Sequence, residues 1–249
     1  MESQKGKEEV EDPFELSPEQ IALNLKTVRE KIDAALKRSG RGGEKVELCA
    51  VSKKKSIADI RAAMDAGQFL FGENYVQEIR EKYDVLQDSC HWHMIGHLQR
   101  NKVKYIIDKV EMIHSVDSVE LAEQIEKEAS KQGRTMDILL EVNVAGEESK
   151  WGFTPEGVLY SAEKIAALEH IRVKGLMTSA PYTENAESNR IYFRHLREIL
   201  KDLQKAGLPN VEADTLSMGM TGDYEVAVEE GATIVRVGTG IFGERNYAK

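Results

Sequence analysis

The chain has 249 residues, of which 41% are hydrophobic and 31% are charged, and its formal net charge is −9. This composition is typical of a soluble globular protein with a sizeable core, and the length suits one large domain such as a single α/β barrel. The acidic balance argues against nucleic acid or an anionic membrane surface as a partner, and no apolar run is long enough to span a membrane.

The first predicted elements are a charged extension and a helix. Residues 1–16 are rich in charged side chains and are expected to form a flexible N-terminal extension. Ser17 is a favourable N-cap and Pro18 suits the first helical position, so a helix is expected to begin here and to end at Gly40. Its apolar stripe at helical spacing consists of Ile21, Leu25, Val28, Ile32 and Leu36.

After this helix, short apolar segments alternate with amphipathic ones. The eight expected strands are residues 46–52, 69–73, 92–98, 112–116, 137–144, 171–178, 213–218 and 233–238. Helical patterns between them include residues 119–132, 155–168 and 186–206. Strands that alternate with helices form right-handed βαβ units and a parallel sheet. Eight such strands favour a closed (β/α)8 TIM barrel, so residues 17–249 are predicted to form one α/β barrel domain.

The first expected strand leads directly into three lysines, in the sequence ELCAVSKKKS of residues 47–56. Successive strand side chains point to opposite faces, so Cys49, Val51 and Lys53 share one face. If that face points into the barrel, Lys53 reaches the end of the barrel where ligands bind. Lys54 and Lys55 are then expected to be solvated at the start of the following helix.

The two cysteines and the N-terminal sequence both indicate the cellular compartment. The two cysteines, Cys49 and Cys90, are too few for a disulfide framework, and Cys49 lies in an apolar strand where a reduced, buried thiol is expected. The charged N-terminus does not resemble a signal peptide. The sequence therefore predicts a cytoplasmic protein.

The last two predicted strands end in loops that combine glycine with hydroxyl residues. The loop after the seventh strand, residues 217–223, reads SMGMTGD, and the loop after the eighth contains Gly238 and Thr239. Glycine lets backbone N–H groups approach an anion closely, and TIM barrels frequently bind a phosphate at these two loops. The glycines could instead only form tight turns, but Ser217 and Thr239 in adjacent loops favour a phosphate site.

A histidine-rich stretch, HWHMIGH at residues 91–97, raises the possibility of a metal site. His91 and His93 share one strand face, and such a pair can bind zinc. No further ligands from other strands obviously converge with them. A hydrogen-bonded structural role is therefore expected for these histidines, and no metal is predicted.

An inward lysine and a phosphate site together indicate a phosphorylated aldehyde as the ligand. A partly desolvated lysine near another cation has a lowered pKa and can form a Schiff base. The aldehyde could be pyridoxal 5′-phosphate (PLP) or a sugar phosphate, as in an aldolase. Arg236 favours PLP, because it can donate a hydrogen bond to a pyridine nitrogen and leave the ring neutral. Alternatively, Arg236 forms a core ion pair with an acid such as Glu141.

Several ordered motifs resemble the pyridoxal phosphate homeostasis proteins, which look like the N-terminal barrel of alanine racemase standing alone. The motifs are AVSK at residues 50–53, FGENYVQE at 71–78, WHMIG at 92–96, LQ at 98–99, NK at 101–102, GLM at 175–177, LSMGM at 216–220, VRVGT at 235–239 and IFG at 241–243. The similarity as a whole runs from about residue 17 to the C-terminus. The sequence departs from the family pattern at Lys54, Ser56 and Thr221.

The resemblance implies a set of cofactor-binding residues. It places PLP as a Schiff base on Lys53 and Arg236 at the pyridine nitrogen. By the same likeness, the phosphate is bound by Ser217, Gly238 and Thr239, and the cofactor is lined by Asn74 and Met218. The family is described as managing vitamin B6 supply without an established reaction.

Three functions follow from these observations. The first is a non-catalytic PLP carrier or regulator, because the chain ends soon after the eighth strand and lacks the second domain of alanine racemase. This carrier is expected to be a monomer, with apo PLP-dependent enzymes as its partners. The second is a PLP-dependent amino-acid racemase or another amino-acid-transforming enzyme that uses Lys53 as its base. The third is a class I aldolase, for which Lys174 on the sixth strand would be the Schiff-base lysine, although its early position favours a solvated amine.

Overall fold

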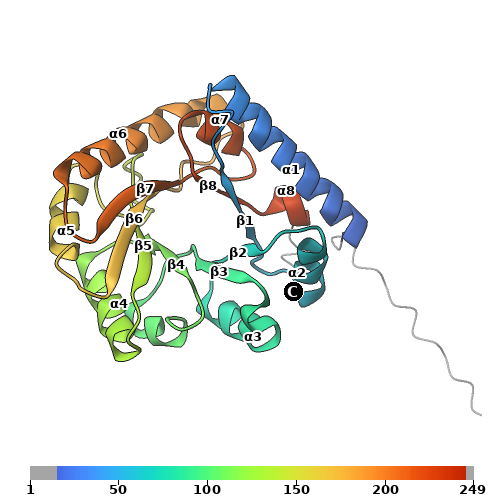
Figure 1. Ribbon diagram of the computed structural model, residues 1–249. Coiled ribbons are helices and arrows are strands. Elements are labelled where there is room, and N and C mark those ends of the chain that lie inside the picture. Colours follow the sequence, from blue (N-terminus) through green and yellow to red (C-terminus); the bar gives the residue numbers. More distant parts are fainter. Residues whose placement is uncertain (1–15, 245–249) are drawn as a thin grey trace, which may run out of the picture.

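Eight parallel strands form a closed barrel in the computed structural model, which describes residues 16–244 (Figure 1). The strands are β1 (Glu47–Val51), β2 (Leu70–Glu73), β3 (His91–Met94), β4 (Met112–Val116), β5 (Met136–Glu141), β6 (Ile171–Met177), β7 (Val211–Ser217) and β8 (Ile234–Val237). They follow one another around the barrel in chain order, and β8 pairs with β1 to close it. The predicted TIM barrel is therefore confirmed.

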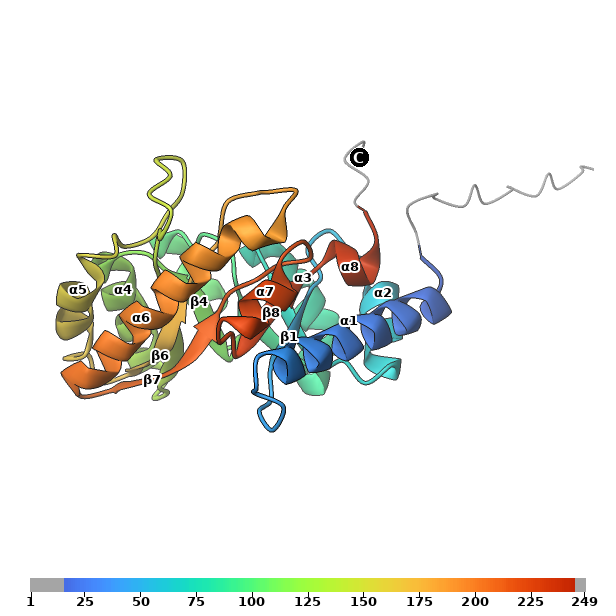
Figure 2. The same ribbon diagram turned by 90° about the horizontal axis from the view of Figure 1, so that it is seen from above.

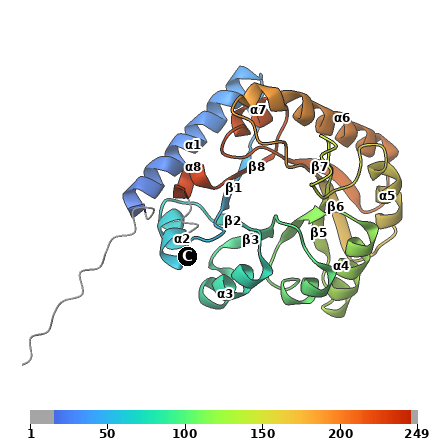
Figure 3. The ribbon, with the colours of Figure 1, turned by 180° about the vertical axis from the view of Figure 1, so that it is seen from behind.

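Helices surround the barrel on its outside, as the view from the opposite end also shows (Figure 3). They are α1 (Pro18–Arg38), α2 (Ile57–Asp65), α3 (Val76–Leu86), α4 (Val119–Lys131), α5 (Val158–Ile165), α6 (Arg190–Ala206), α7 (Tyr224–Glu229) and α8 (Thr239–Phe242), with 3-10 turns η1 (Gln87–Ser89), η2 (Arg100–Tyr105) and η3 (Ala186–Asn189). No helix within residues 16–244 is long and apolar enough to cross a membrane. The predicted N-terminal extension lies outside the described residues, apart from Leu16.

The helix boundaries follow from local chemistry. The hydroxyl of Ser17 accepts a hydrogen bond from the Gln20 N–H at 3.3 Å, so α1 begins at the predicted cap. Its predicted apolar stripe is buried. The helix expected from residue 155 begins later, at Val158, because the Gly157 N–H bonds to the Thr154 hydroxyl in a preceding turn. These differences concern element ends and leave the order of elements unchanged.

The two faces of β1 differ as strand alternation predicts. Leu48 and Ala50 belong to the apolar layer between the sheet and the helices. Cys49 is also fully buried but is not part of that layer, and in the strand register it lies beside Arg236 of β8. Burial raises the pKa of the Cys49 thiol to about 12. The face that carries Cys49 and Val51 therefore points into the barrel, toward the end at which Lys53 follows.

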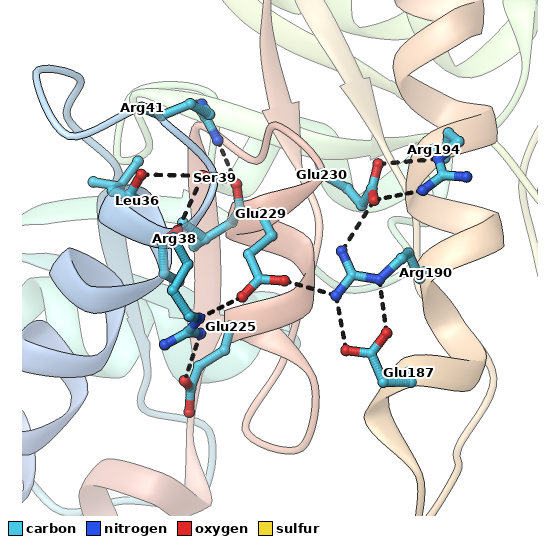
Figure 4. Close-up of polar contacts among 12 residues, drawn as sticks. Leu36, Arg38, Ser39, Arg41, Glu187, Arg190, Arg194, Glu225, Glu229 and Glu230 are labelled. Carbon is cyan, nitrogen blue, oxygen red and sulfur yellow. Dashed lines mark hydrogen bonds and ion pairs between the residues drawn. The ribbon is translucent and has the colours of Figure 1, made fainter.

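A network of ion pairs ties α1, α6 and α7 together on one side of the barrel (Figure 4). Arg38 of α1 donates to Glu229 at 2.7 Å and to Glu225 at 3.0 Å, both in α7. Arg190 of α6 donates to Glu229 at 2.6 Å and to Glu230 at 3.0 Å. Because only 5% of Glu230 is exposed, its carboxylate depends on these arginine partners.

We expect Arg190→Ala to lower the free energy of unfolding by about 1–2 kcal/mol, because Glu229 and the nearly buried Glu230 each lose a partner. Urea unfolding measures this change, which should shrink at high salt. Lys205→Ala removes an exposed ion pair with Asp202 on the same helix and should cause no measurable change. Equal losses in the two variants would contradict this account of the network.

Candidate functional site

A pocket of about 500 Å³ lies at the carboxyl ends of the strands. Its volume falls in the usual range for small-molecule sites. Figure 2 shows the barrel from the side, with two long loops (residues 142–157 and 178–189) rising on the same side as α8. Five of the seven predicted cofactor residues line this pocket: Lys53, Asn74, Arg236, Gly238 and Thr239. The end of the barrel predicted from the strand order is therefore the end that holds this pocket.

The other two predicted residues, Ser217 and Met218, lie away from the pocket lining. Met218 is fully buried in the apolar layer, and its N–H bonds to the Ile234 carbonyl. Ser217 is fully buried inside the barrel, where its hydroxyl contacts Arg236 and His114. The structure thus brings Ser217 next to a pocket residue rather than into the pocket itself.

The three consecutive lysines have different surroundings. Lys53 is half-buried and lines the pocket, while Lys54 is exposed. Lys55 is half-buried, and its amine donates to the Phe242 carbonyl at 2.6 Å and to the Glu244 carbonyl at 3.1 Å. The expectation that Lys55 is solvated was therefore wrong, because its amine satisfies carbonyl groups at the end of α8.

A polar cluster with a buried centre, formed by Ser52, Glu73, Glu78 and Lys82, adjoins Lys53. The Lys82 amine donates to Glu73 at 2.6 Å and to Glu78 at 2.8 Å, and the Ser52 hydroxyl donates to Glu73 at 2.7 Å. Glu73 is fully buried, and burial raises the pKa of its carboxyl while Lys82 opposes that shift. Sequence analysis missed Lys82, which occupies an ordinary helical position in α3.

This cluster also holds the backbone on both sides of Lys53. The Lys82 amine donates to the Ser52 carbonyl at 2.8 Å, and the Glu78 carboxylate accepts from the Lys54 N–H at 2.7 Å. Lys54 has a φ of 59°, in the left-handed region that side chains other than glycine rarely adopt. The bond to Glu78 helps to stabilise that turn, and the turn sets the direction in which Lys53 leaves β1.

Arg236 is the second charged residue of the pocket, and only 4% of it is exposed. One terminal nitrogen donates to the Ser217 hydroxyl at 2.6 Å, and the other donates to the Thr178 carbonyl at 2.8 Å. Among the described residues it forms no ion pair with Glu141, so the alternative of a core ion pair was wrong. Burial lowers the pKa of Arg236, but its guanidinium stays protonated at physiological pH.

Asn189 and Asp223 also line the pocket, and sequence analysis did not assign them a role. The Asn189 side-chain amide donates to the Asp223 carboxylate at 2.7 Å, and the same carboxylate accepts from the Met220 N–H at 2.7 Å. The pair joins the β6–α6 loop to the β7–α7 loop over the cavity. Only the tertiary fold brings these two loops together, so no local motif marks Asn189.

The histidines of the HWHMIGH stretch are hydrogen-bonded, as expected. His91 contacts Glu111 at 2.6 Å, and His97 contacts Asp117 at 3.0 Å. His93 contacts another histidine, His114, at 2.9 Å. Within residues 16–244 no group of three or more potential ligands is arranged to hold a metal ion.

Glu141, at the end of β5, has a perturbed carboxyl. Burial raises its pKa from 4.5 to about 7, although Arg236 opposes the shift. The folded protein therefore holds this proton more tightly than the unfolded chain does. As the pH rises above 4.5, the unfolded chain releases the proton first, and stability falls until the pH passes the folded pKa near 7.

We expect Glu141→Gln to become more stable than the wild-type protein as the pH is raised from about 5 to about 8, by at most about 2–3 kcal/mol. Urea unfolding at several pH values measures the difference. Glu163→Gln, at an exposed position of α5, should show no such trend. A stability difference between Glu141→Gln and wild type that does not vary with pH would contradict the raised pKa.

A closed parallel barrel with a lysine after β1 and an arginine on β8 at one pocket agrees with the alanine racemase N-terminal barrel that the sequence resembles. In agreement, the family described as alanine racemase, N-terminal domain, matches residues 23–246. Alanine racemase of Clostridium difficile 630 superposes with a TM-score of 0.70 at 15% identity, over 92% of this chain and 58% of the other. At that identity the likeness shows the fold alone.

Closer relatives define the family. A pyridoxal phosphate homeostasis protein of Aquifex aeolicus is 48% identical over 224 residues, which cover 90% of this chain and 97% of the relative. The Escherichia coli K12 protein of the same name is 38% identical, over 92% and 98% of the two chains. PipY of Synechococcus elongatus PCC7942, solved with PLP bound, superposes with a TM-score of 0.78 at 35% identity, over 90% of this chain and all of PipY. The chain belongs to the pyridoxal phosphate homeostasis protein family.

Proposed function

We propose that this protein binds PLP as a Schiff base on Lys53 and acts in vitamin B6 homeostasis as a carrier or regulator rather than as a robust catalyst. The observation that carries the proposal is the convergence of Lys53, Arg236, Gly238 and Thr239 on one pocket of about 500 Å³. Membership of the family and the PLP-bound relative PipY support the choice of ligand.

The residues of the pocket suit the three parts of this cofactor. Lys53 would hold the cofactor through its amine, and the cofactor would supply the aldehyde for a C=N bond, with loss of water. Arg236 is a permanent donor, which suits an acceptor such as a pyridine nitrogen. Gly238 and Thr239 offer backbone N–H groups and a hydroxyl at the start of α8 for the phosphate, and Asn74 lines the same cavity.

The alternatives have weaker support from the structure. For an aldolase, Lys174 would have to face the pocket, yet its amine pairs with Glu212 and Asp214 near the start of β7 and it does not line the cavity. A PLP-dependent racemase needs a second proton-transferring group besides Lys53. Glu141, whose pKa is raised to about 7, does not line the pocket, and of the titratable residues Tyr182 and Asp223 that do, Asp223 already accepts hydrogen bonds from Asn189 and the Met220 N–H.

Two measurements on the purified protein test the proposal. Loading with PLP should give a visible absorption band, and borohydride reduction followed by peptide mapping should place the label on Lys53. Loaded protein should then activate an apo PLP-dependent enzyme faster than free PLP does at the same concentration. Label on Lys174, or amino-acid racemisation that is lost in Lys53→Ala, would overturn the proposed carrier function.

The proposal also covers the location, the oligomeric state and the partners of the protein. We place the protein in the cytoplasm, as a monomer whose partners are apo PLP-dependent enzymes, in line with its reduced, buried cysteines. Size-exclusion chromatography with light scattering, with and without an apo-enzyme, measures both associations. A stable dimer of the purified protein would contradict the monomer.

A further inference from the structure

A line of hydrogen bonds runs through the interior of the barrel, from the pocket toward its opposite end. Arg236 of β8 donates to the Ser217 hydroxyl of β7 at 2.6 Å. That hydroxyl contacts Nδ1 of His114 in β4 at 2.9 Å, and Nε2 of His114 contacts Nδ1 of His93 in β3 at 2.9 Å. All four side chains are at most 5% exposed, and Ser217 and His114 are fully buried.

The direction of the chain follows from Arg236, because a guanidinium donates hydrogen bonds and never accepts them. The Ser217 oxygen is therefore the acceptor of the first bond, and its own proton is available to a second group. Among residues 16–244, His114 is the acceptor that lies within hydrogen-bond distance of this hydroxyl. His114 then accepts at Nδ1 and carries its proton on Nε2, which donates to Nδ1 of His93.

The opposite direction would leave a buried group unsatisfied. If His114 were protonated at Nδ1 and donated to Ser217, the serine hydroxyl would receive two hydrogen bonds and its own proton would have no acceptor. Such a loss in a fully buried site is unfavourable. Burial also lowers the pKa of His93 to about 3 and the pKa of His114 well below its ordinary value, so each ring is neutral and carries one N–H.

The chain connects two cavities. Arg236 lines the pocket at the carboxyl ends of the strands, while His93 lines a cavity of about 300 Å³ formed by residues at the starts of β1 to β5. In the derived direction, the remaining N–H of His93 is on Nε2, at the end of the chain away from Arg236. Each side chain in this line donates a hydrogen bond away from the pocket. The Ser217 oxygen and the Nδ1 atoms of His114 and His93 therefore each already accept one.

We propose that Ser217 and His114 are positioning residues that lock the Arg236 guanidinium in the pocket as a hydrogen-bond donor. Together with the Thr178 carbonyl, which accepts from the second terminal nitrogen, they fix the plane of the guanidinium. This inference deepens the proposed function, in which Arg236 meets the pyridine nitrogen of PLP. It gives Ser217 a task other than the phosphate contact predicted from the sequence.

The protonation pattern can be tested without any cofactor. In cofactor-free protein labelled with ¹⁵N-histidine, we expect His114 and His93 to show an unprotonated Nδ1 and a protonated Nε2 at neutral pH. The His114→Asn spectrum assigns the His114 signals, and Ser217→Ala should shift the His114 Nδ1 signal, because that atom loses its donor. A protonated Nδ1 on His114 in the wild-type protein would overturn the proposal whether or not PLP binds.

The positioning role has a second test in PLP binding. His114→Leu removes the acceptor of Ser217 and should weaken PLP binding about tenfold, with a shift of the absorption band. Asn can place its side-chain oxygen near the position of Nδ1, so His114→Asn should recover affinity to within about threefold of wild type. His91→Leu, which removes an exposed histidine from the same end of β3 as His93, should bind normally.

The binding outcomes separate the two proposals. Wild-type affinity and an unchanged band in His114→Leu would refute the positioning role. Failure of the wild-type protein to bind PLP would refute the proposed function, while the ¹⁵N spectrum would still decide the direction of the chain. Circular dichroism identifies a variant that does not fold, and in that case the wild-type spectrum and Ser217→Ala decide the result.

Discussion

Lys53→Ala is expected to abolish the visible band of PLP-loaded protein and to weaken PLP binding roughly 100-fold or more. The variant lacks the amine that would form the C=N bond, so only non-covalent contacts to Arg236, Gly238 and Thr239 remain in the pocket. Absorption spectra and equilibrium dialysis measure the two effects. Because the backbone of residues 52–54 is held by Glu78 and Lys82, the substitution should leave the pocket otherwise intact.

Lys54→Ala is the matched control for this experiment. Its side chain is exposed, and the bond from its backbone N–H to Glu78 does not depend on the side chain. This variant should keep both the band and the affinity. An unchanged band in Lys53→Ala, or an equal loss in the two variants, would show that the reactive amine is not Lys53.

Strand alternation was sufficient to predict that Lys53, among three adjacent lysines, is the one that lines the pocket. Cys49 lies in the barrel interior beside Arg236, and this neighbour relation fixes the inward face of β1. The eight strands and their order were also predictable, because parallel strands alternate with amphipathic helices in a simple pattern. For β1, the side-chain directions that strand alternation predicts are therefore the directions found in the folded barrel.

The polar contacts of the site could not be predicted in the same way. Ser217 was recognised at the end of its strand, but its partner His114 is 103 positions away in the sequence and reaches it across the barrel interior. Lys55 looked like a solvated residue because its acceptors, at the end of α8, are far along the chain. Strand periodicity determines which way a side chain points and does not identify the group that it meets.

Lys82 is the clearest case of a residue whose role depends on tertiary contacts. Lys82→Met is expected to lower the free energy of unfolding by about 3–5 kcal/mol, since it leaves Glu73 in a buried position without a positive partner. Urea unfolding measures the loss. Its control is the double variant Lys82→Met with Glu73→Gln, which removes the buried charge and should recover much of the stability.

The loss in Lys82→Met should depend on pH with a definite sign. Burial already raises the pKa of Glu73, and without Lys82 the carboxyl loses an interaction that lowers it. When the pKa of a carboxyl is higher in the folded than in the unfolded protein, the carboxyl contributes most to stability below the unfolded pKa. That contribution is lost as the pH rises through the folded pKa. The variant should therefore be least impaired in acid and most impaired above neutral pH. A loss that is the same at every pH, or a double variant no more stable than Lys82→Met, would mean that packing around the Lys82 side chain, rather than compensation of the Glu73 charge, stabilises this part of the barrel.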